Sequence, residues 1–380
     1  PCLERVMQYP TISYLTNVQF GAGSLVDLPE VIQRVGMQRP LVVTDGGLLN
    51  RGFVERLNLN NPVVFSEIET NPTEASVLLG VEAYRREACD GIIALGGGSP
   101  MDAAKGIGIM ATHDLALEDM AFICGGLEKI TSEVVPIIAI PTTSGTGSEV
   151  GRGALISMAS GQKLAIISPH IIPKWSIVDP ELTLELPPLL TAATGMDALS
   201  HCLETYCSNV YNPVAGAIAI DGLRRGWSKI KTVVDDGQNI VARSEMMMCA
   251  MQGALSFQKG LGVIHAVSHP LGALRRKRLH HGTLNAVFMP HAIRFNLDSA
   301  RQETRVISST LGISSGTDGL ADAFSELNRV LGLPQNLEEM GIDAGDLDGI
   351  AEQALRDHCG FTNPRTLTLK NLESLLKSAL

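Results

Sequence analysis

The sequence has little of what marks several large classes of protein. Aromatic residues make up 4% of its 380 residues, and 40 acidic side chains against 30 basic ones give a net charge of −10. Nucleic acids and anionic membranes select basic surfaces, and bases stack on aromatic rings, so neither partner is expected. The sequence also has no run of 18 apolar residues and no recognisable signal peptide. We therefore expect a protein that neither spans a membrane nor is exported.

Disulfide and metal motifs built on cysteine are missing as well. The seven cysteines are an odd number, and no two of them form a CxxC pair. This usage is typical of reduced thiols and predicts a cytoplasmic location. Hydrophobic residues make up 45% of the chain, which is ample for cores, and the length predicts two domains.

The first half of the chain alternates short apolar runs with helical patterns. Apolar runs without polar alternation are typical of strands buried on both faces of a parallel sheet. Helical patterns between them indicate βαβ units and a Rossmann-like, doubly wound nucleotide-binding domain. The predicted strands are 40–44, 62–68, 91–95, 136–140 and 175–179, and the predicted helices 24–36, 52–58, 73–88 and 100–113.

Two further features concern the ends of this first domain. The opening segment 11–23 is predicted to be extended and to turn, as a candidate antiparallel edge strand. From Pro187 onward the sequence has helical periodicity and few β-branched runs. We therefore predict an α/β domain over residues 1–186 and a helical domain over 187–380.

Two loops rich in small residues each follow a predicted buried strand. In ALGGGSPMDAAKG (94–106) three glycines allow close approach of backbone amides to a diphosphate, and Ser99, Pro100 and Asp102 suit a first helical turn. The loop is neither GxGxxG nor a Walker A motif. The second loop is IPTTSGTGSEVG (140–151). Ligands bind at the carboxyl ends of parallel strands, so two such loops together favour a nucleotide site.

Asp45 ends an early strand in VVTDGG (42–47). A carboxylate at such a position can accept hydrogen bonds from a ribose and repel a 2′-phosphate, which favours NAD over NADP. An aspartate before two glycines is also a common turn former, so both interpretations stay open.

Six of the nine histidines lie between 197 and 291, a stretch that Asp197 opens. Asp197 and His201 are four residues apart, as are His265 and His269, and this spacing places side chains on one face of a helix. Carboxylate and imidazole groups between apolar residues predict a divalent metal site. Such a metal acts as a Lewis acid on an alcohol or a carbonyl, and a nicotinamide carries the hydride.

These motifs resemble the iron-dependent (group III) alcohol dehydrogenases over essentially the whole chain. The matching segments are GGGSPMDAAK, PTTSGTGSEV, GMDALSHCLETY, HAVSHPLGA and HHGTLNAVFMPH. The resemblance implies an N-terminal Rossmann-like domain, a C-terminal helical domain and NAD-linked oxidation of an alcohol to an aldehyde or ketone. We also expect a homodimer or a larger homo-oligomer.

The resemblance further implies roles for single residues. It assigns Fe²⁺ to Asp197, His201, His265 and His281, because the family's fourth ligand directly precedes a glycine; His280 is left beside the site. His269 is the histidine that relays the alcohol proton. Zn²⁺ binds such ligands more tightly than Fe²⁺, so the metal depends on supply. The cofactor contacts implied for NAD are Asp45, Gly97, Gly98, Ser99, Asp102, Thr142, Thr143, Ser144 and Lys163.

The substrate is left open between a simple alcohol and a hydroxy acid of the 4-hydroxybutyrate type. The segment between the third and fourth predicted ligands is strongly basic at Arg275, Arg276, Lys277 and Arg278. Such a turn is usually solvated. If it faces the cleft, it would read the carboxylate of a hydroxy acid, and Arg152 could serve likewise.

Overall fold

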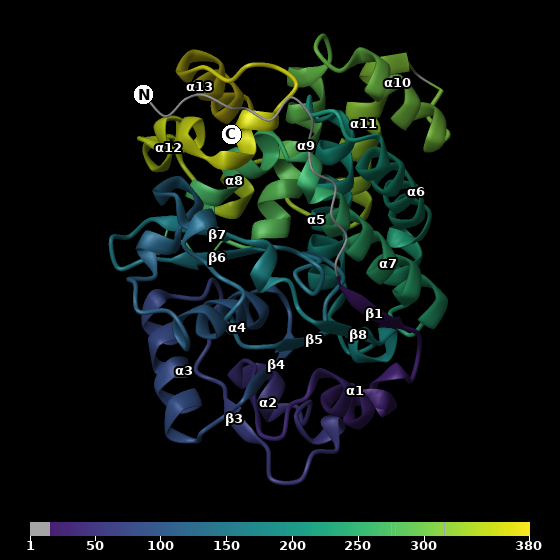
Figure 1. Cartoon of the computed structure of the whole chain (residues 1–380). Coiled ribbons are helices and arrows are strands. Elements are labelled where there is room, and N and C mark those ends of the chain that lie inside the picture. The colour runs from purple at the N-terminus through teal and green to yellow at the C-terminus, as the bar shows by residue number, and fades with distance from the viewer. Residues whose placement is uncertain (1–15, 275, 278, 315) are drawn as a thin grey trace.

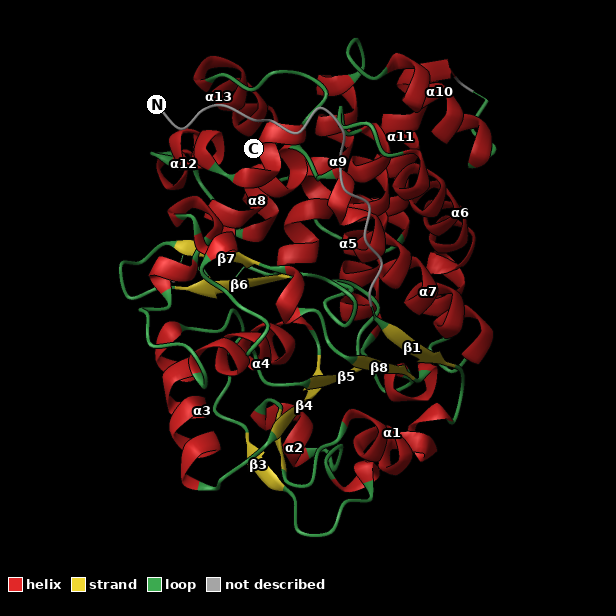
Figure 2. Ribbon diagram, viewed as in Figure 1, coloured by secondary structure: helices red, strands yellow, loops and turns green. Residues whose placement is uncertain are grey.

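The chain folds into an α/β half and a helical half that lie against each other (Figure 1). The computed structural model describes residues 16–274, 276–277, 279–314 and 316–380; for residues 316–318 it describes the backbone alone. A two-stranded hairpin lies between the sheet of the first half and the helices of the second (Figure 2). None of the helices in these ranges is long and apolar enough to cross a lipid bilayer.

The α/β half is built on a six-stranded sheet in which every pairing is parallel. The order β1-β8-β5-β4-β2-β3 is that of a doubly wound sheet, so the carboxyl ends of all six strands meet at one edge. The strands are β1 (Asn17–Phe20), β2 (Pro40–Val43), β3 (Val63–Phe65), β4 (Gly91–Gly96), β5 (Ile137–Pro141) and β8 (Trp175–Val178).

Helices cover both faces of this sheet, which explains why its central strands are apolar at every position. Ile92 and Ala94 of β4 pack into the core beneath α3 (Glu74–Arg86) and α4 (Gly98–Met110). Ile93 and Leu95, which point the other way, belong to the core beneath α1 (Leu28–Val35). The side chains of Thr73 and Ser76 form a reciprocal capping box that starts α3.

The helical half consists of nine α-helices among the described residues. It begins with Pro188 in the first turn of α5, where proline costs no hydrogen bond. The predicted boundary at 186 falls between η7 (Pro180–Thr183) and α5, and the division into two domains stays a prediction. The helices are α5 (Pro188–Cys207), α6 (Pro213–Asp235), α7 (Ile240–Ser256), α8 (Val263–Gly272), α9 (His281–Asn296), α10 (Arg301–Thr310), α11 (Gly316–Val330), α12 (Ile350–Arg356) and α13 (Leu369–Ser378).

The predicted antiparallel edge strand is wrong in direction. β1 lies at the edge of the sheet, but it runs parallel to β8, with Asn17 opposite Trp175 and Phe20 opposite Val178. The carboxylate of Asp179, directly after β8, accepts hydrogen bonds from the backbone of Gly23 and Leu25. The turn after β1 is thereby fixed to the end of β8, so both strands must finish at the same edge. Residues 11–15 of that prediction lie outside the described residues.

Two local predictions also differ from the structure. The helix expected over 52–58 is reduced to the 3₁₀ turn Glu55–Leu57, because Gly52 and Asn58 at its two ends have φ values of +73° and +50°, which a right-handed helix does not allow. The helix in this region is instead α2 (Gly46–Asn50). The hairpin of β6 (Gly153–Ser157) and β7 (Lys163–Ile167) was not predicted.

Candidate metal and cofactor site

Three helices bring one carboxylate and three imidazoles to the same point. Asp197 and His201 lie one turn apart on α5, His265 is on α8, and His281 begins α9. The Oδ1 atom of Asp197 is 3.5 Å from Nε2 of His201, 3.9 Å from Nε2 of His265 and 3.7 Å from Nε2 of His281. Asp197, His201 and His265 are buried. These four side chains are brought together as the sequence predicted.

The electrostatics of the cluster suit metal binding. Burial lowers the pKa of His201 to about 3 and lowers the pKa of His281 well below its usual value. Both rings are therefore neutral at pH 7, and neutral imidazole is the form that ligates a metal. At His265, burial lowers the pKa but the hydrogen bond and charge of Glu204 raise it further, so this ring gives up a proton when a metal binds. One carboxylate and three imidazole nitrogens are a donor set that fits Fe²⁺ or Zn²⁺.

Two residues that the sequence reasoning missed hold these candidate ligands in place. Glu204 Oε2 lies 2.6 Å from Nδ1 of His265, an arrangement that leaves Nε2 of this ring free to bind. Asn285 Nδ2 donates to Asp197 Oδ1 over 2.7 Å. The signal was present in the spacing, since Glu204 is three residues after His201 and Asn285 four after His281.

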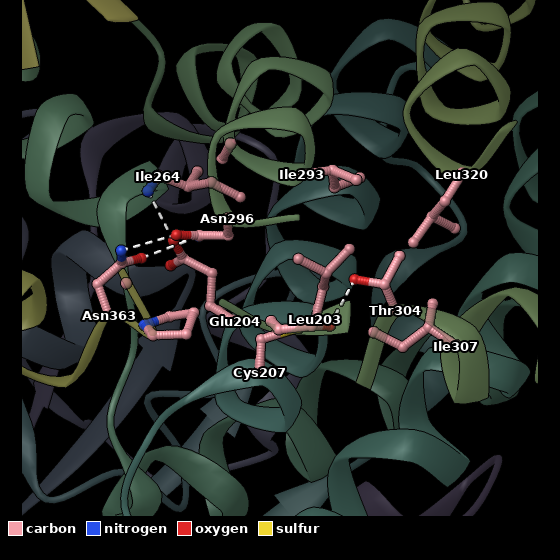
Figure 3. A pocket seen from close by; sticks show the side chains of 14 residues that line it. Leu203, Glu204, Cys207, Ile264, Ile293, Asn296, Thr304, Ile307, Leu320 and Asn363 are labelled. Atoms are coloured by element: carbon pink, nitrogen blue, oxygen red, sulfur yellow. Dashed lines mark hydrogen bonds between the residues drawn. The ribbon is translucent and has the colours of Figure 1, made fainter. Parts of the chain in front are cut away.

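Glu204 also lines a small cavity between α5, α9 and α10 (Figure 3). The other Glu204 oxygen accepts a hydrogen bond from the backbone of Ile264, and Asn363 and Asn296 pair beside it. The cavity has a volume of about 20 Å³, room for about one water molecule and not for a substrate. It is lined mainly by apolar side chains of the helical core.

His269 lies one turn beyond His265 on α8. Its ring stacks on that of His281, with 5.4 Å between centroids and 15° between planes. Its Nδ1 is hydrogen-bonded to Asp357 rather than to a member of the metal cluster. His280 occupies the N-cap position of α9 without a capping hydrogen bond from its side chain, and its Nδ1 lies 3.5 Å from the Thr283 hydroxyl. The structure thus places His269 beside the candidate ligands, where the resemblance put it.

The two small-residue loops leave neighbouring strands, β4 and β5, and touch each other. Thr142 N donates to the Gly96 carbonyl, and a Cβ on Gly98 would lie 2.6 Å from the Thr146 methyl. Gly97 is the N-cap of α4, and Gly98 and Ser99 form its first turn. A helix that starts at such a loop presents unpaired backbone N–H groups to an anion. The arrangement therefore fits a diphosphate.

The side chains of Lys105, which is buried, and Asp102, which is partly buried, hold these loops in place. Lys105 Nζ donates to the carbonyl and hydroxyl of Ser148 and to the carbonyls of Gly151 and Gly153, at 2.8–2.9 Å. The Asp102 carboxylate accepts from the Ser148 hydroxyl and the Leu155 backbone. All the hydrogen bonds seen for Asp102 are thus with the protein, and its cofactor contact stays a prediction.

The remaining predicted cofactor residues lie around the same sheet edge. Asp45 caps α2, with its Oδ1 accepting from Leu48 N, so its turn-forming role is seen and its ribose contact stays a prediction. Lys163 opens β7 and donates to Asn71 Oδ1 over 2.7 Å. Burial lowers the pKa of Lys163. In the second loop, Thr142 and Ser144 are buried and Thr143 is partly buried.

The basic turn lies only partly within the described residues, since Arg275 and Arg278 are outside them. Arg276 and Lys277 both pair with Asp346, at 2.6 and 3.0 Å. These two cations are therefore already matched by a carboxylate, and a role for the turn in binding substrate stays a prediction. Arg152 is exposed, and its guanidinium has no ion pair with a described residue.

Gly282 allows α9 to approach α5 beside the metal cluster. A Cβ at this position would overlap the carbonyl oxygen of Ala193 and lie 3.2 Å from Cβ of Asp197. We expect Gly282→Ala to lower the free energy of unfolding by about 2 kcal/mol, because overpacking forces helices apart. Urea unfolding measures this loss. The control Gly272→Ala, whose Cβ would meet only Leu284 at 3.9 Å, should leave stability nearly unchanged; equal effects would contradict the prediction.

The fold and the site together are those of a dehydrogenase, with a candidate nucleotide-binding edge of the sheet on one side and a histidine-rich candidate metal site on the other. Residues 16–180 match the family model of iron-containing alcohol dehydrogenases. Residues 191–380 match the model of the C-terminal part of the Fe-containing alcohol dehydrogenases. The chain therefore belongs to the iron-containing alcohol dehydrogenase family and is an NAD-dependent enzyme of that family.

Similar proteins cover the whole chain. It is 45% identical to 4-hydroxybutyrate dehydrogenase of Cupriavidus necator, over 97% of this chain and 99% of that one. It is 36% identical to 1,3-propanediol dehydrogenase of Citrobacter freundii, over 98% and 100%. The crystal structure of a 1,3-propanediol oxidoreductase superposes with a TM-score of 0.91 at 35% identity, covering 97% and 100%. The sulfoacetaldehyde reductase from Bifidobacterium kashiwanohense, solved in complex with NAD⁺, gives 0.88 at 26% over 98% of both chains.

Proposed function

We propose that this enzyme oxidises a short ω-hydroxy acid of the 4-hydroxybutyrate type to the corresponding semialdehyde, reversibly, with NAD as hydride acceptor. The observation that carries the proposal is the full-length similarity to a 4-hydroxybutyrate dehydrogenase, at 45% identity against 36% for the 1,3-propanediol enzyme. Of the two substrate classes that the sequence leaves open, the hydroxy acid is therefore favoured.

The residues of the chain divide the work between two sides of the site. Gly97, Gly98 and Ser99 offer the start of α4 to the diphosphate of NAD, next to Thr142, Thr143 and Ser144. Asp45 holds the adenosine ribose and Lys163 the nicotinamide ribose. Asp197, His201, His265 and His281 would hold Fe²⁺, or Zn²⁺ where its supply is greater. A bound cation supplies Lewis acidity that makes an alcohol easier to deprotonate, and NAD takes the hydride.

The hydroxyl proton needs an acceptor in the protein, and His269 lies beside the candidate metal ligands, with its ring stacked on that of His281. Its Nδ1 is engaged by Asp357, so its Nε2 is the nitrogen available for the substrate side. Glu204 and Asn285 keep His265 and Asp197 oriented while this proton moves. We further propose that the enzyme works in the cytoplasm as a homodimer or a larger homo-oligomer.

The substrate is tested by comparing 4-hydroxybutyrate with 1,4-butanediol, which has the same length and a hydroxymethyl group in place of the carboxylate. We expect kcat/KM for NAD⁺ reduction to be at least about tenfold higher with the acid, because an ionic contact is worth upwards of ~1.4 kcal/mol in a partly desolvated cleft. A preference for the diol would contradict the proposal and favour a general alcohol or diol dehydrogenase, which the similarity to 1,3-propanediol dehydrogenase supports as the second candidate.

Two variants then locate the carboxylate contact. Arg152→Ala removes a cation without an ion-pair partner among the described residues, and Arg276→Ala removes one that is paired with Asp346. The variant that raises KM for 4-hydroxybutyrate and leaves KM for 1,4-butanediol unchanged identifies the contact.

A further inference from the structure

Asp357 lies directly against the candidate proton acceptor. Its Oδ2 is 2.8 Å from Nδ1 of His269, and its Oδ1 accepts a hydrogen bond from the backbone N–H of Cys359 over 2.9 Å. The side chain of His269 is 5% exposed and that of Asp357 12%, so the pair is largely shielded from water. The carboxylate is thus hydrogen-bonded to one imidazole and one backbone amide, and Nδ1 of a second imidazole, that of His358, lies 3.6 Å from its Oδ1.

The segment that carries Asp357 is fixed to the start of α8. Asp357 is the N-cap of the 3₁₀ helix η11 (His358–Thr362). The Thr362 hydroxyl donates to the Leu261 carbonyl, and the Asn363 side chain accepts from Val263 N, at 2.8 and 3.1 Å. His269 is on α8, so hydrogen bonds between the η11 segment and the start of α8 hold the Asp357 carboxylate next to the His269 imidazole.

This geometry selects one tautomer of His269. A carboxylate can only accept, so Nδ1 of the ring must carry a proton, and in the neutral ring Nε2 then has a free lone pair. Among the described residues no hydrogen bond is made to Nε2. Asp357 accepts hydrogen bonds from Nδ1 of His269 and from the backbone N–H of Cys359, and both bonds favour the ionised carboxylate, which is the accepting form.

We infer that Asp357 is a positioning residue that keeps Nε2 of His269 unprotonated and turned toward the reacting alcohol. The inference rests on the proposed function, in which His269 takes the hydroxyl proton as the hydride leaves for NAD. When Nε2 accepts that proton the ring becomes a cation, and the adjacent Asp357 carboxylate stabilises it. Asp357 itself need not take up a proton.

The variant Asp357→Asn separates this role from a structural one. The backbone N–H of Cys359 requires an acceptor, so the amide oxygen of Asn should stay on Cys359 and the amide NH₂ should face His269. The NH₂ donates to Nδ1 and forces the proton to Nε2, where it blocks proton uptake. Asp357→Ala leaves space in which water can accept from Nδ1 and leaves both tautomers accessible.

We expect Asp357→Asn to lower kcat by about 100-fold or more, with KM within about twofold, as for loss of a general base. Asp357→Ala should lose less. A purely structural role predicts the opposite order, because Asn preserves shape and the cap of η11. Asp343→Asn is the matched control: Asp343 caps another 3₁₀ turn through two backbone amides and contacts no histidine. Its kcat should equal that of the wild type. Ala being more damaging than Asn would overturn the inference.

Two readouts do not depend on turnover. In ¹⁵N-histidine-labelled, Zn²⁺-loaded protein, Nε2 of His269 should have the chemical shift of an unprotonated nitrogen, and Asp357→Asn should exchange the shifts of the two ring nitrogens. Were the wild type inactive on every alcohol, the proposed function would fail while this spectrum still decided the inference. His269, Asp357 and Cys359 also lie close enough to share a metal. A second metal per chain that is lost in Cys359→Ser would overturn the tautomer role.

Discussion

Replacing Asp197 with asparagine should reduce kcat/KM by roughly 1,000-fold or more and remove the bound metal. The expected loss corresponds to several kcal/mol of Lewis-acid stabilisation, at ~1.4 kcal/mol for each factor of ten. Asp197 is the only anion within the four-residue cluster, and its Oδ1 is the atom on which the three Nε2 atoms converge. Without its charge, only the three imidazoles remain as ligands, and a divalent cation is held weakly.

Steady-state kinetics and metal analysis on the same preparation test this expectation. Asn has nearly the shape of Asp, so the fold should persist, and the urea midpoint of the metal-stripped forms should agree. Asp235→Asn serves as the control, since Asp235 is an exposed carboxylate at the end of α6 that pairs with Lys231. Full activity of Asp197→Asn, or unchanged metal content, would contradict the assignment.

Lys105→Met should destabilise the fold by about 3 kcal/mol or more and weaken NAD binding. The ammonium of Lys105 is buried, and burial lowers its pKa to about 8, so it is mainly charged at pH 7. Methionine fills nearly the same volume but leaves three oxygens of the second cofactor loop and the Gly153 carbonyl of β6 without this donor, and it removes the positive charge near Asp102. A buried acceptor that loses its donor costs ~1–3 kcal/mol, so the loss of several together accounts for the expected size.

Urea unfolding and NADH titration measure the two effects. Lys129→Met is a matched control, because Lys129 also donates to two backbone carbonyls but lies at the surface; its loss should cost under about 1 kcal/mol. Adding Asp102→Asn to Lys105→Met should recover part of the stability, since the uncompensated carboxylate disappears. If the double variant were less stable than the single one by the full cost of Asp102→Asn alone, the two groups would not be coupled.

Much of the fold is predictable because a strand that is buried on both faces of a sheet has a continuously apolar sequence. The continuously apolar runs at 91–95 and 136–140 could only be inner strands, and β4 and β5 lie there. The helical periodicity predicted after 187 is that of α5, α6 and α7. In these segments the local sequence pattern and the tertiary environment favour the same secondary structure.

The errors occur where long-range contacts decide the structure. The direction of β1 depends on Asp179, more than 150 residues away, and no pattern within 11–23 contains that information. The β6–β7 hairpin alternates buried and partly buried residues over only five positions, and it is held by Lys105 and Asp102 from another element. Residue type alone did not reveal these partners.

In the candidate site, too, local sequence patterns predicted some residues, and long-range contacts determine others. Asp197, His201, His265 and His281 could be selected from their spacing and motifs, and the structure places them around one point. Asp357 could not be, since it is 88 residues from His269 and its neighbourhood has no helical or metal-type spacing. Groups that orient other groups are visible only once the chain has folded.

Metal titration of the stripped enzyme tests the central claim most directly. The rate of NADH formation from 4-hydroxybutyrate should be near zero after chelation and dialysis. It should then rise linearly with added Fe²⁺ and level off at one equivalent per chain, with Asp197→Asn showing no response. A stripped enzyme that keeps its full rate without added metal would contradict the account.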